Sequence, residues 1–494
     1  MYRIKAIIFS TCVLLSTLMI IALAIGVTFY VYSSYVDNSI ELNASRNFLA
    51  IVTVILVVSS IIAYIFRHYV ITEIVDALIV VAIYWFIVPF VNALIYGYVI
   101  GLDFVNALFE SVSGFSGTGL TILSDIEKYP YIVLMWRAAT QWIGELSVVV
   151  FSGALLPHIH RILSRVYVAE RGVRFAPTIL STTRRMLITY IILTIIGVFM
   201  FMYSGMEFLD ALAHSMTGIA TGGMSTNTQS IAYWYKTHGY RILVVSTIVM
   251  ILGALNFVDL YNLVRGKIKE FFKSLEVKWF ILITVILAII TIGITLCLLG
   301  NSFEHVVIVI YNLMSGLTTT GFQVGDIGRY PDILKILIIL AMAIGGATFS
   351  TAGGIKIKRV ALVLKSVVWS LSKSFLPENV YIVKKVNGEI VEDEDIVSTY
   401  AFILLYIVIA LTASASLFII LQVRGYNWSY SYIDVLFETV SALSCVGLST
   451  GVTTIFMPLE AKVVLMIVMY LGRLEFLPIY LIIGYLYRKK ITLG

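Results

Sequence analysis

The sequence predicts an all-α polytopic membrane protein with an N-terminal helical hairpin and four pseudo-repeats, each built as helix, re-entrant loop and helix. Three observations support this prediction. Of the 494 residues, 60% are hydrophobic and only 13% are charged, which is too apolar for a water-soluble chain of this length. Several apolar runs approach the roughly 20 residues that a helix needs to cross a bilayer. Four stretches share one short pattern that ends on a glycine.

The apolar runs are the candidate spanning helices. We expect the first run to be a span rather than a cleaved signal peptide, because it is long and no small-residue cleavage site follows it. The candidate runs cover residues 7–31, 48–66, 74–95, 133–156, 187–202, 242–263, 280–299, 333–343, 400–421 and 463–486.

Basic residues indicate how the spans are oriented. The net charge is +6, and with the N-terminus inside, the inner loops hold most of the 34 lysines and arginines. This asymmetry follows the positive-inside rule. It predicts a multi-pass protein of the cell membrane with both termini in the cytoplasm and all four glycine motifs on the outer side.

The domain organisation follows from the repeated pattern. Residues 1–68 lack the glycine motif and are expected to form an accessory two-helix hairpin. The repeats are predicted to cover 69–165, 166–266, 267–366 and 367–494, the last with a cytoplasmic linker before it. In that linker, Asn387-Gly388 is typical of a tight hairpin turn.

A short apolar run precedes each glycine motif. Two or three helical turns cannot cross a bilayer, so these runs are expected to re-enter the membrane, and the loops after them must satisfy their backbone within protein or water. The short runs cover 104–114, 211–218, 306–316 and 435–442.

The four motifs align on Gly119, Gly223, Gly321 and Gly447, spaced by 104, 98 and 126 residues. A serine or threonine stands six residues before each glycine, and an apolar residue stands four before it. A single glycine loop between membrane helices is usually only a turn. Four aligned copies in one chain can surround one axis, and this favours an ion filter around a central pore.

The chemistry of a filter explains these residue types. A bare cation needs oxygen ligands in place of its water, and a ring of inward-facing backbone carbonyls can supply them. Glycine permits the unusual dihedral angles, and the short helices would direct their partially negative C-terminal ends inward. The candidate filter residues are Gly117, Thr118, Gly119, Thr221, Gly222, Gly223, Thr319, Thr320, Gly321, Cys445, Val446 and Gly447.

The chain resembles the Trk/Ktr/HKT superfamily of potassium transporters over roughly residues 70–490. The resemblance is carried by Leu-Phe-Glu-Ser-Val-Ser-Gly-Phe at 108–115, Gln-Trp-Ile-Gly at 141–144, Leu-Asn-Phe at 255–257, Thr-Thr-Thr-Gly at 318–321, the glycine-rich run at 345–354 and Gly-Arg-Leu-Glu at 472–475.

This resemblance implies a four-loop pore for potassium uptake, since a glycine (Gly119) stands in the first repeat. It also implies a homodimer and a cytoplasmic nucleotide-binding regulatory subunit, although anionic lipid headgroups explain the basic inner linkers equally well. Two positions depart from the family pattern. Gly117 stands where hydroxyl residues are common, and Glu145 stands where a small residue is expected.

The run at 345–354 holds four glycines and three hydroxyl residues inside an apolar span. This composition breaks helices, so it predicts either a kink that allows close packing or a loop that lines a cavity. The resemblance implies a gate below the filter, formed by Gly345, Gly346, Gly353 and Gly354.

Arg473 is a charge within the last apolar run, and a charge at that depth is a functional candidate. It either forms a structural salt bridge with Glu475 or Glu145 or, as the resemblance implies, faces the pore as a barrier to cations. Among the other acids, Glu110 and Glu438 share one aligned column and are expected to brace the short helices.

The remaining residues predict no enzyme. The cysteines Cys12, Cys297 and Cys445 lack disulfide or metal-ligand spacing, the six histidines are scattered, and a metal site at His158 and His160 is not favoured. No catalytic motif appears, and potassium is expected as the substrate with no cofactor. The alternative function is a sodium- or proton-coupled transporter of a small solute, which would show inverted repeats instead of four copies in one direction.

Overall fold

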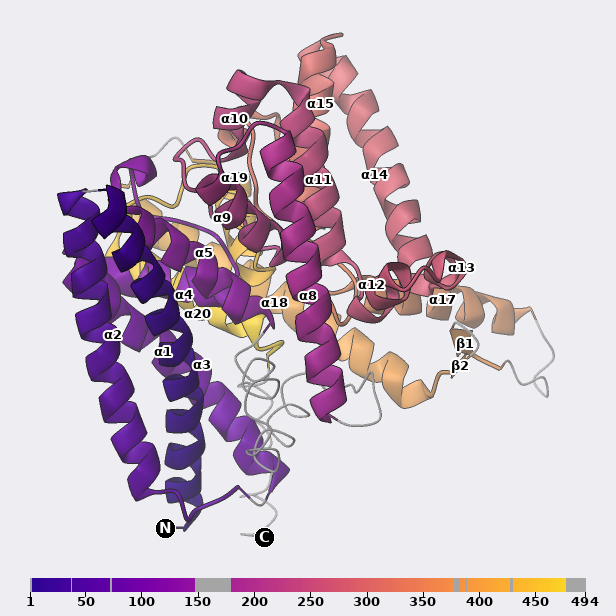
Figure 1. Ribbon diagram of the computed structural model, residues 1–494. Helices are drawn as coiled ribbons and strands as arrows, with labels where there is room; N and C mark the ends of the chain where they lie inside the picture. The colour runs from indigo at the N-terminus through magenta and orange to yellow at the C-terminus, as the bar shows by residue number, and fades with distance from the viewer. Residues whose placement is uncertain are drawn as a thin grey trace.

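A computed structural model describes residues 2–36, 38–71, 73–146, 179–375, 383–386, 389–426 and 430–476. The described chain is helical apart from two short strands, as the sequence predicts. Within it, six helices are long and apolar enough to cross a membrane, and a bent pair is a further candidate. In Figure 1 the long helices stand around the outside, and the short helices α4, α9 and α19 lie among them.

The N-terminal hairpin consists of α1 (Tyr2–Val36) and α2 (Ser39–Ile65), which pack on each other and against α3 and α5. Asn38 begins α2 by accepting hydrogen bonds from the next turn. Buried Glu41 accepts bonds of 2.8 Å from the N–H groups of both Tyr131 and Ile132, at the start of α5. The hairpin therefore caps an inner helix of the protein.

Four consecutive groups of helices follow, and we call them units 1 to 4. Each unit has a long helix, a short helix, a glycine loop and an inner helix. Unit 1 comprises α3 (Ile74–Ile100), α4 (Phe104–Ser116), the turn η1 (Ile126–Lys128) and α5 (Tyr131–Leu146). Unit 2 comprises α8 (Ile179–Tyr203), α9 (Phe208–Ile219), α10 (Ile231–His238), α11 (Tyr240–Ala254) and α12 (Phe257–Val264).

Units 3 and 4 repeat the arrangement. Unit 3 comprises α13 (Ile268–Lys273), α14 (Leu275–Leu299), α15 (Phe303–Leu317), η3 (Ile327–Arg329), α16 (Asp332–Ile344) and α17 (Ile357–Ser374). Unit 4 comprises α18 (Asp393–Val423), α19 (Tyr432–Leu443) and α20 (Leu459–Arg473). The residue boundaries of the five predicted domains stay predictions.

The units pack in a cycle. The inner helix of each unit contacts the short helix of the next: α5 contacts α9, α11 contacts α15, α16 contacts α19, and α20 returns to α4. Polar side chains begin three of the short helices, where Asp103, Ser302 and Ser431 accept hydrogen bonds from backbone N–H groups of the first turn. The short helices are therefore held at a common centre by their neighbours.

The candidate spanning run 242–263 does not form one unbroken helix. The chain breaks between α11 and α12, and the second helix is bent by 115° relative to the first. The physical reason is a competing set of polar contacts, because the Asn256 side chain caps α12 and also donates to the carbonyl of Thr348 at 2.8 Å. The N–H of Phe257 donates to the carbonyl of Phe349, so the chain leaves the helix to meet unit 3.

The prediction of a continuous last span over 463–486 is also corrected, because α20 ends at Arg473. The N–H groups of Glu475 and Phe476 donate back to the carbonyls of Gly472 and Leu471, and both residues have positive φ angles. This is the bonding of a Schellman helix end. The later part of this run, and residues 147–156 of the run at 133–156, lie outside the described residues.

The two strands that flank the predicted hairpin turn are present. β1 (Lys385–Val386) pairs antiparallel with β2 (Glu389–Ile390) in the register Lys385 to Ile390. The turn residues Asn387 and Gly388 lie outside the described residues.

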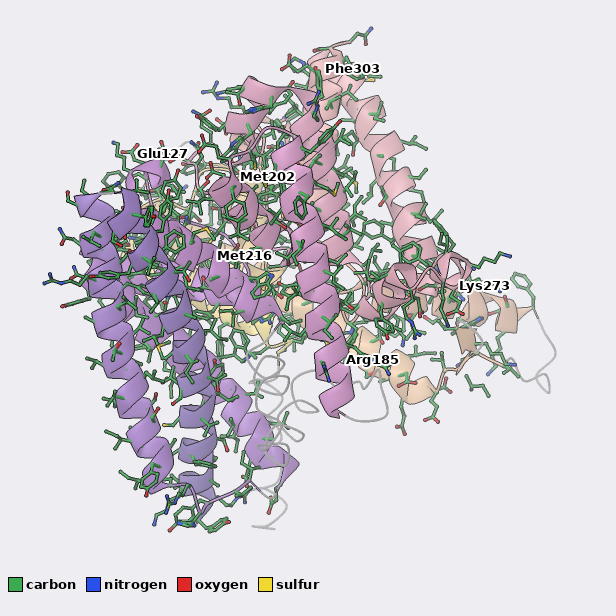
Figure 2. The ribbon with its side chains drawn as sticks, in the orientation of Figure 1. Glu127, Arg185, Met202, Met216, Lys273 and Phe303 are labelled. Carbon is green, nitrogen blue, oxygen red and sulfur yellow. The ribbon has the colours of Figure 1, made fainter. Side chains whose placement is uncertain are left out.

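Figure 2 shows the side chains on the ribbon. Glu127 and Phe303 lie toward one end of the molecule, and the basic residues Arg185 and Lys273 lie toward the other.

Candidate functional site

The four glycine loops (116–119, 220–223, 318–321 and 444–447) contact one another in a closed ring. At each aligned glycine, an added Cβ would overlap a carbonyl oxygen of the next unit. That carbonyl always belongs to the residue just before the next aligned glycine. The overlapping pairs are Gly119 with Gly222, Gly223 with Thr320, Gly321 with Val446, and Gly447 with Thr118.

Each short helix ends in the same way, which explains the local backbone. The residue two before the aligned glycine is left-handed in every unit, with φ of 71° at Gly117, 50° at Thr221, 53° at Thr319 and 53° at Cys445. Its N–H donates to the residue three before it, and the next N–H donates five residues back, as in a Schellman motif. Three of these residues carry side chains, so the hydrogen bonds and the surrounding protein impose the conformation rather than glycine alone.

The hydrogen bonding gives the loops an electrostatic direction. The last three N–H groups of every loop donate back to their own short helix, to backbone carbonyls or, at Gly321 and Gly447, to the Ser315 and Ser441 hydroxyls. These N–H groups are thus all hydrogen-bonded to the short helices, and the partially negative C-terminal ends of the four short helices point toward the loops. Carbonyl oxygens are the remaining backbone polar groups of the loops, and that of Gly222 also accepts from Gln141, so the chemistry of the ring suits a cation.

The position nine residues before each aligned glycine holds a polar side chain in every unit, and we call these four residues the polar column. They bind the segments that follow the glycine loops. Glu438 accepts from the Ser449 hydroxyl at 2.8 Å and from the Thr450 and Thr453 N–H groups at 3.1 and 3.0 Å. Glu110 accepts from Thr121 at 2.9 Å in the same way. The expected bracing role of Glu110 and Glu438 is confirmed by these contacts.

Sequence reasoning missed the other two members of this column. Asn312 bonds both the N–H and the carbonyl of Val324, at 3.0 and 2.8 Å, and His214 Nε2 lies 2.9 Å from the Ser225 hydroxyl. All four members can form hydrogen bonds, so the alignment on the glycines could have identified the column.

Glu110 is also part of a buried ion pair. The guanidinium of Arg137 lies 2.7 Å from Glu110, and both side chains are 1% exposed. Arg137 also donates to the carbonyl of Ser225 at 3.2 Å, just after the glycine loop of unit 2. Through Arg137, the buried pair of unit 1 therefore also binds unit 2.

Further contacts tie successive units together beyond the ring. Thr228 donates to Glu127 at 2.7 Å, the Gln323 N–H donates to the Ser230 hydroxyl at 3.2 Å, and the Ser449 N–H donates to the Gln323 side chain at 3.1 Å. Hydrogen bonds from its own backbone N–H and from Thr228 lower the pKa of the Glu127 carboxyl below its usual value. These contacts keep the loops in register.

Gln141 on α5 holds the loop of unit 2. Its amide donates to the carbonyl of Gly222 at 2.6 Å and its oxygen accepts from the N–H of Met224 at 3.0 Å.

The 345–354 loop separates α16 from α17 and lies against the glycine loops. The N–H of Gly353 donates to the Thr319 hydroxyl at 2.8 Å, and a Cβ on Gly353 would overlap the carbonyl of Ser444. Thr351 donates to the carbonyls of Ile219 and Gly253 at 2.9 and 2.8 Å. The loop thus touches units 2, 3 and 4 on the side where the short helices end, and it is not merely a kink in a continuous helix.

A buried carboxylate holds this loop in place. Glu276, 6% exposed at the start of α14, accepts from both the N–H and the hydroxyl of Thr348 at 2.6 Å. It also accepts from Asn256 at 2.7 Å, at the break between α11 and α12. The two irregular segments are therefore latched together.

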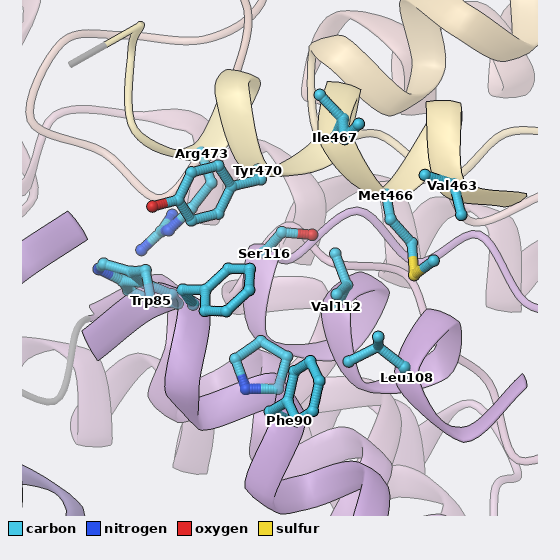
Figure 3. Close-up of a pocket in the computed structure, with 12 residues that line it drawn as sticks. Trp85, Phe90, Leu108, Val112, Ser116, Val463, Met466, Ile467, Tyr470 and Arg473 are labelled. Atoms are coloured by element: carbon cyan, nitrogen blue, oxygen red, sulfur yellow. The ribbon is translucent and has the colours of Figure 1, made fainter. Parts of the chain in front are cut away.

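Arg473 lies at the last residue of α20 and forms an ion pair with Glu145, whereas Glu475 pairs with Arg359 at 2.6 Å. The guanidinium of Arg473 lies over the ring of Trp85, 4.8 Å from the ring centre. Figure 3 shows Arg473 and Ser116 among the residues that line an apolar cavity of about 350 Å³ between α3, α4 and α20.

Among the described residues, no three His, Cys, Asp or Glu side chains gather as a metal site. His158 and His160 lie outside the described residues.

Comparison with known proteins places this fold among transporters. Residues 44–486 match the TrkH family, described as cation transport protein. An uncharacterized cation transporter of Methanocaldococcus jannaschii is 30% identical over 420 residues, covering 83% of each chain. The Trk system potassium uptake protein TrkG of Escherichia coli is 29% identical over 84% of this chain and 86% of its own length.

The crystal structure of the potassium transporter TrkH from Vibrio parahaemolyticus has the same fold. It superposes with a TM-score of 0.81 and 22% sequence identity, over 96% of this chain and 97% of the other.

We expect Arg137→Met to destabilise the protein by about 3–5 kcal/mol, because it leaves the buried Glu110 carboxylate without its counter-charge. Thermal unfolding in detergent measures this change. Lys128→Met is the control, since Lys128 and its partner Asp125 are 74% and 58% exposed and the substitution should leave the transition in place. Equal unfolding temperatures for wild type and Arg137→Met would contradict a structural role of the pair.

We expect Gly447→Ala to lower the unfolding temperature far more than Gly101→Ala. Both glycines have positive φ angles, 95° and 68°, so both substitutions place an L-residue at positive φ, which costs about 1–2 kcal/mol. At Gly447 the new Cβ also overlaps the carbonyl of Thr118, whereas nothing lies within 4 Å at Gly101. Similar effects of the two substitutions would show that the ring contact is unimportant.

Proposed function

Because the chain belongs to the TrkH family of cation transport proteins, we propose that it carries potassium ions across the cell membrane through a pore enclosed by its four glycine loops. It is a multi-pass membrane transporter rather than an enzyme. The single observation that carries the proposal is the closed ring of glycines and carbonyl oxygens, to which every unit contributes one contact. The potassium uptake function that names the Escherichia coli relatives supports the choice of ion.

The ring is suited to a dehydrated cation for three reasons. Its N–H groups are bonded to the short helices, so they do not repel a cation or attract an anion. Four helix ends add partial negative charge. Four loops around one axis can present carbonyl oxygens from all sides, as an ion needs when it loses its water. We propose as filter residues the three residues that end each loop: 117–119, 221–223, 319–321 and 445–447.

The 345–354 loop is proposed as the gate. Its contacts with Thr319 and Ser444 support a position directly beside the filter, on the side of the short-helix ends. Ala347, Ser350, Thr351 and Ala352 are all buried, so the loop fills space between the units. Gly345, Gly346, Gly353 and Gly354 permit the changes in backbone dihedral angles that movement of the loop would need. Loss of the Glu276 contacts would remove one of the attachments of the loop, beside those of Thr351 and Gly353.

We propose that Arg473 acts as an electrostatic barrier to cations in the pore only to the extent that no nearby acid compensates its positive charge. A cation at membrane depth repels a permeating ion unless another charge compensates it. The ion pair with Glu145 bears directly on that balance.

The remaining assignments concern orientation and partners. We propose cytoplasmic termini, since basic residues such as Arg185 and Lys273 lie at the end opposite Glu127 (Figure 2). We further propose a homodimer, regulated by a cytoplasmic nucleotide-binding subunit that docks on the basic inner segments, and transport without a cofactor. Anionic lipid headgroups are the competing ligand for those segments.

Rubidium flux tests the proposed function. Purified protein in proteoliposomes should take up rubidium when the interior is made negative, since about 2.3 kcal/mol per charge is gained per 100 mV. Excess potassium should compete far better than excess sodium. Absence of rubidium flux, or uptake that requires a sodium or proton gradient and a small solute, would instead favour the coupled transporter.

The gate predicts that Thr348→Val raises basal rubidium flux by about fivefold, because it removes one hydrogen bond worth roughly 1 kcal/mol from the latched loop. Potassium-over-sodium preference should be unchanged, since no filter residue is altered. Thr412→Val is the matched control, because the Thr412 hydroxyl bonds only within its own exposed helix. Unaltered basal flux in a stably folded Thr348→Val protein would argue against the latch.

A further inference from the structure

Two opposite charges occupy matching positions in neighbouring units. Near the end of three inner helices, a glycine lies so close to a short helix that a Cβ would meet the carbonyl of the residue four before the aligned glycine. These contacts pair Gly144 with Phe115, Gly253 with Ile219, and Gly472 with Leu443. The residues that follow the three glycines are Glu145, Ala254 and Arg473. Units 1 and 4 therefore carry an acid and a base where unit 2 carries a methyl group.

These two charges meet where the cycle of units closes, because α20 of unit 4 packs on α4 of unit 1. The Arg473 guanidinium donates to the Glu145 carboxylate, to the carbonyl of Gly144 at 2.5 Å and to the carbonyl of Glu145 at 3.3 Å. The Glu145 side chain is 3% exposed and that of Arg473 is 13% exposed. The guanidinium also lies over the ring of Trp85, and Figure 3 shows the two side chains near each other. The pair is thus buried, and each charge depends on the other.

The first glycine loop is shaped around this carboxylate. A Cβ on Gly117 would overlap a carboxylate oxygen of Glu145 and would lie 2.6 Å from its carboxyl carbon. The same column holds Thr221, Thr319 and Cys445 in the other units, all left-handed, so the backbone conformation alone does not require glycine there. The space that a side chain would fill at Gly117 is instead filled by Glu145. The two residues that depart from the expected pattern therefore contact each other.

We propose that Glu145 sets the charge beneath the filter: its carboxylate supports the first glycine loop at Gly117 and neutralises Arg473, so that permeating cations meet no net positive charge there. This inference rests on the proposed pore. Gly117 stands two residues before its aligned glycine. The same position in unit 4, Cys445, faces the gate loop, since Gly353 lies against Ser444 and Cys445. Glu145 acts as a positioning residue and as an electrostatic partner, and it need not touch the ion.

A double-substitution cycle tests the charge balance. Rubidium uptake and its voltage dependence are compared for wild type, Glu145→Gln, Arg473→Gln and the double variant in proteoliposomes. Glu145→Gln should lower uptake by about tenfold, because it removes the negative charge that lies beside the Arg473 guanidinium. Adding Arg473→Gln should restore uptake to within about twofold of wild type. Glu475→Gln removes the acid of the more exposed Arg359 pair and should have no effect.

Two results would overturn the proposal: wild-type uptake in Glu145→Gln, or a double variant as impaired as Glu145→Gln alone. A purely structural pair would give the second result, with lowered unfolding temperatures in all three variants and an unchanged voltage dependence.

A steric exchange tests the contact independently of transport. Gly117→Ser should lower the unfolding temperature in the wild-type background, because the new side chain collides with the Glu145 carboxylate. In a Glu145→Gly background the same substitution should lower the unfolding temperature much less, because the collision is removed and only the backbone strain of an L-residue at the positive φ of 71° remains. Equal effects in both backgrounds would refute the contact. If the wild-type protein carries no rubidium, the proposed function fails, and this second cycle still decides whether Glu145 shapes the loop.

Discussion

The structure depends on the contact between each aligned glycine and a carbonyl oxygen of the next unit. These contacts leave no room for a Cβ, and they run through all four units before returning to the first. Such a ring needs four loops at one level and one radius. The cyclic packing of inner helices on short helices, the polar column behind the loops and the buried pair of Arg137 with Glu110 all serve that requirement.

The orientation of the loop backbones also determines which sign of charge would suit the proposed filter. A Schellman end on each short helix directs the loop N–H groups back to that helix, so carbonyl oxygens rather than N–H groups are the available backbone atoms of the ring, although that of Gly222 also accepts from Gln141. In the proposed filter the backbone would supply the preference for cations, and the three residues that end each loop include glycine, threonine, cysteine and valine. Glu145 and Arg473 add a pair of opposite charges where the cycle closes between units 1 and 4.

Much of this arrangement could be predicted from the sequence because it is repeated. Four aligned glycines identify the loops, the short helices and the bracing acids Glu110 and Glu438 without any tertiary information. The break at Asn256 and the end of α20 at Arg473 could not be predicted, since both lie in apolar runs and are imposed by polar contacts with distant segments. The partner of Arg473 was open for the same reason, because Glu475 is near in sequence and Glu145 is near only in the folded chain.

The most direct test is crystallographic. Rubidium scatters anomalously, so crystals of the protein grown in rubidium show where a bare cation binds. The account predicts an anomalous peak on the axis of the ring, surrounded by the carbonyl oxygens of the residues that precede Gly119, Gly223, Gly321 and Gly447. A ring without rubidium, with the ions bound elsewhere between the helices, would contradict it.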